Sequence, residues 1–108
     1  MPAINIIQYQ LIGEGYCADW NYLPEGGYPK VLNEDHKLYD PDRVQECLNR
    51  CVDASKKNNN IQSQAFYVDV NSRCACSKGT CQALKGSGYK SYKIYMQHIP
   101  GLLQTRFP

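Results

Sequence analysis

The chain has 108 residues, a net charge of +2, six cysteines and nine tyrosines. This length suffices for one domain and not for two, and the apolar content excludes a disordered tail. The near-neutral charge gives no reason to expect nucleic acid as a partner. No stretch is long and apolar enough for a transmembrane segment.

The N-terminal residues predict an extended strand. β-branched and aromatic residues partly alternate from Ile4 to Ile12, and Gly13 and Gly15 then end the pattern. We therefore assign residues 1–12 to an N-terminal strand or arm, which precedes the main domain.

A long loop from Tyr16 to Leu38 follows, rich in glycine, proline, asparagine and tyrosine. We expect a short hairpin within it around Glu25-Gly26-Gly27. Aromatic rings in such a loop can stack on sugars or anchor a protein partner, and the alternative is that they cover the small core. The candidate partner-binding residues of this loop are Tyr16, Trp20, Tyr22, Tyr28 and Tyr39.

The clearest predicted element is a helix from Pro41 to about Lys56. Asp40 suits the N-cap, and Pro41 suits the first helical position. Lys56 and Lys57 suit the negative end of the helix dipole. Apolar positions recur at helical spacing on one face, which consists of Val44, Cys47, Leu48, Cys51 and Val52.

The remaining chain predicts three strands. Gln64 to Val70 and Arg73 to Ser77 read as a hairpin with its turn at Asn71-Ser72. Gly86-Ser87-Gly88 is expected to be a flexible joint. Tyr89 to Met96 is the predicted final strand.

Four of the cysteines have matching spacings. Cys47 and Cys51 leave the same face of the helix about 6 Å apart, and Cys74 and Cys76 leave the same face of a strand about 6.6 Å apart. Two adjacent disulfides could therefore join the helix to the strand. We predict Cys47–Cys76 and Cys51–Cys74, although the opposite helix direction would give the swapped pairs.

The other two cysteines, Cys17 and Cys81, are then expected to pair and to tie the N-terminal region to the sheet. A metal site is the alternative, because the Cys47/Cys51 and Cys74/Cys76 pairs could supply four thiolates to zinc. That alternative leaves Cys17 and Cys81 unused, and we therefore expect disulfides and no metal.

Six cysteines in a short chain indicate an oxidising compartment. This compartment would be extracellular or an organelle lumen, including the thylakoid lumen. The first residues lack the basic and apolar regions of a signal peptide. We therefore expect that a leader has been removed.

The cysteine pattern and its surroundings resemble the PAN/apple superfamily. The resemblance covers about residues 13–95 and depends on a Cys-x-x-x-Cys helix, an aromatic strand and a cysteine-bearing strand. The matching segments are Gly15-Tyr16-Cys17, Glu46-Cys47-Leu48-Asn49-Arg50-Cys51, Gln64-Ala65-Phe66-Tyr67-Val68 and Cys74-Ala75-Cys76. One departure is Gln62-Ser63-Gln64, where the family usually places a cysteine.

The resemblance implies an α+β fold for residues 13–96, in which a curved antiparallel sheet packs on one α-helix. It also implies the nested pairing, first cysteine with last and inward. Members of this superfamily bind proteins or glycans and perform no chemistry themselves. The resemblance therefore predicts a binding module.

Catalysis has little support in the sequence. A nucleophile needs a base within hydrogen-bond reach, and the chain has only two histidines, His36 and His98. His36 lies in a polar loop typical of a solvated side chain, and every cysteine has an expected bond. We therefore expect no catalytic residue and no cofactor.

The last segment, residues 97–108, is expected to be an extended C-terminal arm. Leu102, Leu103 and Phe107 are apolar, lie outside the domain pattern and are candidate partner-binding residues. We predict a structural or docking subunit that contacts other protein subunits, either extracellular or lumenal as in a photosynthetic supercomplex. The alternative is a lectin-like or heparin-type glycan-binding module.

Overall fold

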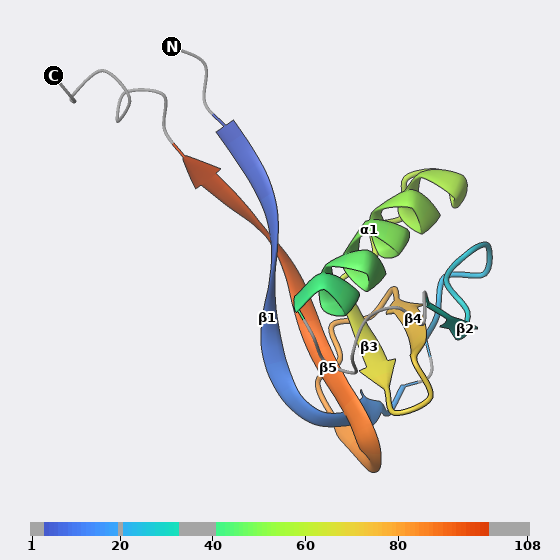
Figure 1. Ribbon diagram of the computed structural model, residues 1–108. Helices are drawn as coiled ribbons and strands as arrows, with labels where there is room; N and C mark the ends of the chain where they lie inside the picture. Colours follow the sequence, from blue (N-terminus) through green and yellow to red (C-terminus); the bar gives the residue numbers. More distant parts are fainter. Residues whose placement is uncertain (1–3, 20, 33–40, 100–108) are drawn as a thin grey trace, which may run out of the picture.

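The computed structural model describes residues 4–19, 21–32 and 41–99. The elements in chain order are β1 (Ile4–Cys17), β2 (Lys30–Val31), α1 (Pro41–Lys57), β3 (Ala65–Asp69), β4 (Arg73–Ser77) and β5 (Leu84–Ile99). The strands form one antiparallel sheet in the order β1-β5-β3-β4-β2, and α1 packs against it (Figure 1). The predicted α+β class, with one helix and an antiparallel sheet, is therefore correct.

The main core lies between α1 and the sheet. α1 begins at Pro41 as predicted and ends one residue beyond the expected Lys56. Its apolar face and the facing strands bury a single cluster, because the helical and strand periodicities both point these side chains inward. The buried cluster includes Leu23, Leu32, Val44, Cys47, Leu48, Cys51, Phe66, Val68, Cys74, Cys76 and Tyr92.

The two long strands, β1 and β5, extend further than the sequence predicts. β1 continues past Gly13 and Gly15 to Cys17, because two register shifts absorb the extra residues without ending the pairing with β5. The predicted joint at 86–88 lies inside β5 as a bend. Gly86 and Gly88 have φ angles of 81° and 80° there, which favour glycine.

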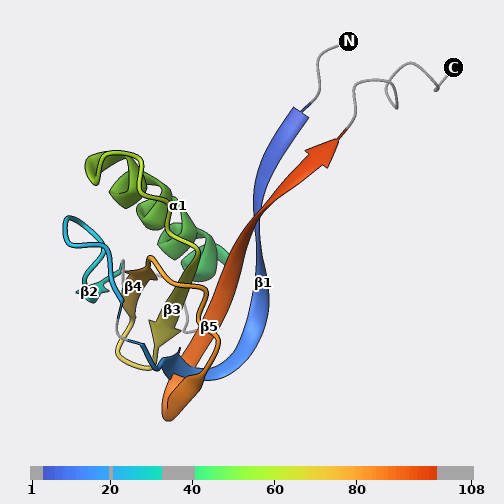
Figure 2. The ribbon, with the colours of Figure 1, turned by 180° about the vertical axis from the view of Figure 1, so that it is seen from behind.

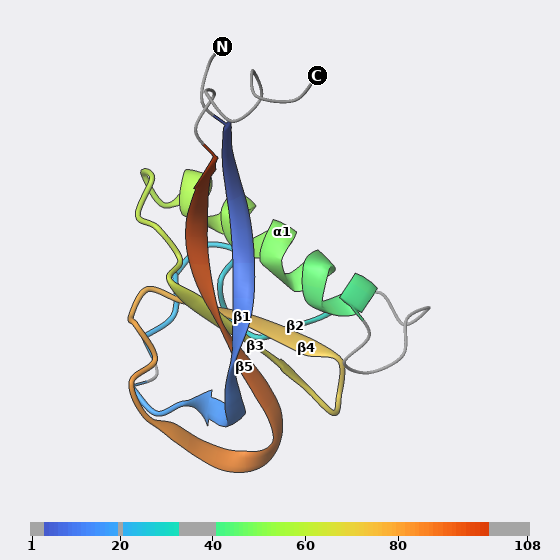
Figure 3. The ribbon, with the colours of Figure 1, turned by 90° about the vertical axis from the view of Figure 1, so that its left-hand side faces the viewer.

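Part of β1 and β5 projects beyond the rest of the sheet. β3 pairs with β5 only between Tyr89 and Lys93, whereas β1 pairs with β5 as far as Ile4 and Ile99. Residues 4–9 and 94–99 therefore form a two-stranded ribbon without a third strand from the described part of the chain, and we call this ribbon the arm. Figures 1, 2 and 3 show it standing out from the domain, with the described chain ends at its tip.

The segment before α1 contains a turn and a short strand where a loop with a hairpin is predicted. The Leu23 N–H donates to the carbonyl of Cys76, whose own N–H donates to the carbonyl of Gly27, at 2.9 and 2.8 Å. The chain thus reverses around residues 24–26 against β4 without two paired strands of its own.

No helix among the described residues has the length and apolarity to cross a membrane.

Three disulfides hold these layers together: Cys17–Cys81, Cys47–Cys74 and Cys51–Cys76. Cys17–Cys81 is the predicted pair. The predicted pairs Cys47–Cys76 and Cys51–Cys74 are wrong. The matching spacings do join α1 to β4, but α1 runs in the direction that brings Cys47 to Cys74, so the swapped alternative holds.

Candidate functional site

The predicted aromatic loop residues do not form one open platform. Tyr16 and Tyr22 contact other tyrosines edge to face: Tyr16 contacts Tyr89 with ring centres 5.0 Å apart, and Tyr22 contacts Tyr67 at 6.1 Å. Tyr67 and Tyr89 are themselves 5.1 Å apart. The four rings therefore form a continuous tyrosine ladder, in which packing between rings takes up much of their surface.

The hydroxyl groups at one end of this ladder are held in their neutral form. Burial raises the pKa of both Tyr22 and Tyr67, whose rings are neighbours. The effect is stronger at Tyr67, because the neighbouring Tyr22 hydroxyl also raises its pKa. Such groups stabilise the sheet and do not act as bases near neutral pH.

Tyr28 is the exposed member of the predicted set, with 56% of its surface accessible. Its ring is exposed, but no second ring of the predicted set contacts it among the described residues. The other predicted contacts, Trp20, Tyr39, Leu102, Leu103 and Phe107, lie outside the residues that the structure describes, as does His36.

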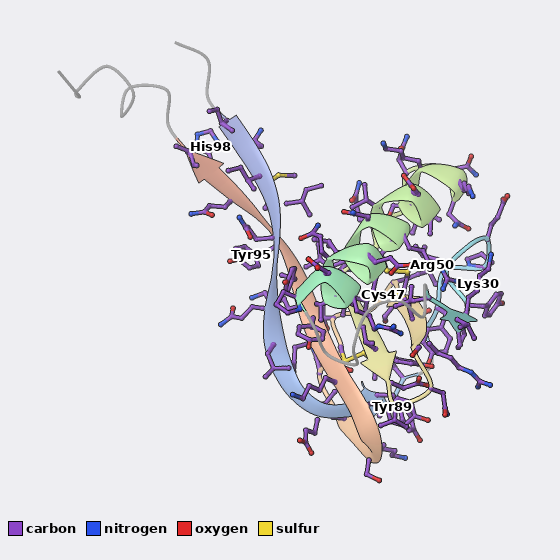
Figure 4. The ribbon with its side chains drawn as sticks, viewed as in Figure 1. Lys30, Cys47, Arg50, Tyr89, Tyr95 and His98 are labelled. Carbon is purple, nitrogen blue, oxygen red and sulfur yellow. A yellow bond between two sulfur atoms is a disulfide. The ribbon has the colours of Figure 1, made fainter. Side chains whose placement is uncertain are left out.

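A residue that the sequence did not single out, Arg50 of α1, holds the loop that carries Tyr28. Its guanidinium donates to the carbonyls of Gly26 and Cys74 at 2.9 Å and of Lys30 at 3.3 Å, and also to the carbonyl of Tyr28. Burial lowers the pKa of Arg50. Figure 4 shows Arg50 beside Lys30, between α1 and β2.

The arm is the feature that most resembles a binding surface. It contains no aspartate, glutamate, lysine or arginine, and the uncharged run on β1 continues to Ile12. Large apolar side chains are nonetheless exposed there. Those with at least 38% of their surface accessible are Ile4, Ile7, Tyr95 and Met96.

Exposed apolar groups lie on both faces of the arm. Antiparallel partners point to the same face, so Ile7 and Met96 share one face, as do Gln8 and Tyr95 on the other. A two-stranded ribbon is at best marginally stable alone in water. The exposed apolar side chains of the arm are therefore typical of a surface that another molecule covers.

A groove separates α1 from the arm at the point where β3 begins. Its volume is about 180 Å³, and its walls come from β1, α1, β5 and the segment that leads into β3. None of the side chains that line it is charged. They are Ile7, Cys51, Val52, Ser55, Gln62, Ser63, Gln64, Ile94, Tyr95 and Met96.

Polar contacts near the tip fix the two strands to each other. The Nδ1 of His98 lies 2.8 Å from the Oδ1 of Asn5, directly across the ribbon. The second histidine of the chain is thus a cross-strand partner in the structure. Figure 4 shows His98 and Tyr95 on the arm, remote from Cys47.

The cysteine cluster offers no metal site in its oxidised form. The sulfur atoms of Cys47, Cys51 and Cys74 lie within 4.8 Å of one another. Each of them is bonded in a disulfide, and the surrounding core is apolar. Since zinc binds thiolates, these residues could serve it only after reduction.

The sequence carries one signal for the arm. The uncharged run from Ile4 to Ile12 marked an unusual strand, because exposed edge strands normally carry charges or proline that prevent further pairing. Recognising it as an exposed edge required the sheet order, which the sequence alone did not supply. Comparison of the chain with protein-family models, curated proteins and solved structures finds no match.

Proposed function

We propose that this chain is a non-catalytic, disulfide-stabilised module that docks onto other protein subunits in an extracellular or lumenal compartment. The observation that carries the proposal is the uncharged arm, which exposes apolar groups on both faces and borders a neutral groove. A partner that buries Met96 and Ile7 would gain the free energy of apolar burial without removing any charge from water.

Three further features support docking. The disulfides indicate an oxidising compartment and keep the small core rigid. The described strands of the arm are already paired, so little ordering entropy is lost on binding. The resemblance to PAN/apple domains would also make the chain a binding module.

Glycan binding, the alternative function, has weaker support. Tyr16 and Tyr22 pack edge to face on neighbouring tyrosines. The lysines are also dispersed. Lys56 and Lys57 end α1, whereas Lys85 and Lys90 flank the β5 bend at the opposite end of the molecule (Figures 1 and 3).

A charge placed on the arm tests the docking function. We expect Met96→Lys to lower the fraction of the chain in its native assembly at least tenfold, because the lysine would have to leave water at the interface. Native gels and gradient sedimentation of extracts from the expressing organism measure that fraction. Met96 is 60% exposed, so the thermal unfolding of the variant should match that of the original chain.

Val70→Lys is the matched control, since Val70 is 56% exposed and follows β3, remote from the arm. It should assemble normally. Full incorporation of Met96→Lys, or recovery of the unaltered chain only as a free protein, would contradict the proposal. Binding to a glycan array at low salt, unaffected by Met96→Lys, would favour the alternative instead.

A further inference from the structure

The outer edge of β1 has no neighbouring strand among the described residues. β1 lies at the end of the sheet order and pairs only with β5. Natural edge strands are normally blocked by charges, prolines or bulges. From Ile4 to Leu11 this edge carries none of them, because its first register shift follows Leu11 and its first charge is Glu14.

The register identifies which backbone groups face outward. The Ile94 N–H donates to the Gln64 carbonyl at 3.0 Å, so Ile94 and alternate residues of β5 face away from β1. Tyr95 then faces β1 and pairs with Gln8. Backbone groups alternate along a strand, and the outward-facing residues of β1 are therefore Asn5, Ile7, Tyr9 and Leu11.

A second hollow lies under α1 beside this edge. β1 contributes Ile7 to it and β5 contributes nothing, so it opens on the β1 side of the sheet. Apolar side chains from β1 and α1 line it together with the charged Asp53, and the Gln45 amide N–H donates to the Asn49 side-chain carbonyl at 2.9 Å. The hollow is lined by Ile7, Gln45, Leu48, Asn49, Val52 and Asp53.

We infer that the outer edge of β1 pairs with the same edge of a second copy of this chain. An antiparallel arrangement about Gln8 places Ile7 opposite Tyr9 of the second copy and Asn5 opposite its Leu11. The four facing pairs would form about eight backbone hydrogen bonds, two for each pair. A β-branched side chain opposite an aromatic one is a favourable cross-strand pair.

Charge and symmetry favour a second copy as the occupant. Every residue in the paired segment is neutral, so the edge meets itself without like-charge repulsion, and Glu14 lies beyond the segment. A two-fold contact uses the same edge on both chains and closes the assembly at a dimer. This closure would explain how an unprotected edge avoids indefinite strand addition.

Sedimentation of the oxidised chain from micromolar to millimolar concentration tests the inference. We expect the mass to double from 12.3 kDa. Hydrogen exchange should show slow amides at Ile7 and Tyr9 in the dimer. In dilute solution these amides should exchange much faster than those of Ile6 and Gln8, which face β5.

Two variants test this contact, and the second of them, Met96→Lys, separates it from the docking proposed above. Ile7→Pro removes an outward N–H and keeps the β1–β5 ladder, so it should abolish the dimer. Met96 lies on β5, one strand away from the outer edge of β1, so Met96→Lys should keep the dimer. Three results would each overturn the inference: a monomer at all concentrations, fast exchange at Ile7 and Tyr9 in a dimer, or a dimer that persists in Ile7→Pro. The exchange measurement uses the unaltered chain and so does not depend on whether a variant folds.

Discussion

At the scale of single residues, Arg50 does most to place the segment before α1. One guanidinium donates to four backbone carbonyls on the loop, on β2 and on β4, and its rigid planar fork of five donors suits several acceptors at once. Lysine at this position keeps the charge but loses most of these bonds. The loop that bears Tyr28 therefore depends on the shape of this side chain.

We predict that Arg50→Lys lowers the free energy of unfolding by about 2 kcal/mol, the magnitude typical for lost hydrogen bonds to a charged group. Urea unfolding under oxidising conditions measures the loss. Limited proteolysis should also show faster cleavage within residues 21–32. Arg73→Lys, at an exposed position, is the control, and an equal effect of both substitutions would contradict the role assigned to Arg50.

The hydroxyl of Tyr67 makes the free energy of unfolding depend on pH. Burial raises its pKa in the folded chain, whereas the unfolded chain ionises near the ordinary value of about 10. Below that pH neither state is ionised, and the contribution of Tyr67 to stability is fully present. Above it the unfolded state loses a proton that the folded state retains, so the free energy of unfolding falls as the pH rises.

We therefore predict that urea midpoints fall between about pH 9 and pH 11, across the ordinary tyrosine pKa. The fall should be shallower in Tyr67→Phe, which has no proton to lose. Tyr28→Phe is the control, because Tyr28 is exposed and should leave the slope unchanged. Identical slopes in all three proteins would show that Tyr67 does not control the alkaline limit.

At the scale of elements, the sequence predicted the parts whose signals are local. The helix followed from Pro41 and the spacing of Val44, Cys47 and Leu48, and the β3–β4 hairpin followed from its turn at residues 71–72. These patterns depend on residues a few positions apart, so tertiary context did not alter them.

The features that depend on distant partners were not predictable in this way. β1 passes Gly13 because β5 supplies a partner there, and β2 exists only because Cys74 and Arg73 lie beside it. The cysteine spacings limited the helix–strand pairs to two alternatives, but the choice between them needed the direction of α1. The arm could not be predicted either, because it depends on β3 pairing with only part of β5.

At the scale of the whole molecule, a small core and three disulfides share the task of stabilisation. α1 and the sheet enclose one main cluster, and Cys17, Ala65 and Cys81 form a minor one. Each disulfide typically contributes about 2–4 kcal/mol, and domains of this kind are stable by about 5–15 kcal/mol in total. The disulfides therefore supply a large part of the margin between folded and unfolded states.

We predict that the denatured, non-reduced chain has no free thiols, since the structure leaves none of its cysteines unpaired. Reduction should then unfold the domain cooperatively, because the core alone offers too little apolar burial to replace three cross-links. Thiol titration in guanidinium and circular dichroism with and without reductant measure the two effects. Six free thiols before reduction, with folding restored by zinc, would instead establish the four-thiolate site that Cys47, Cys51, Cys74 and Cys76 could form.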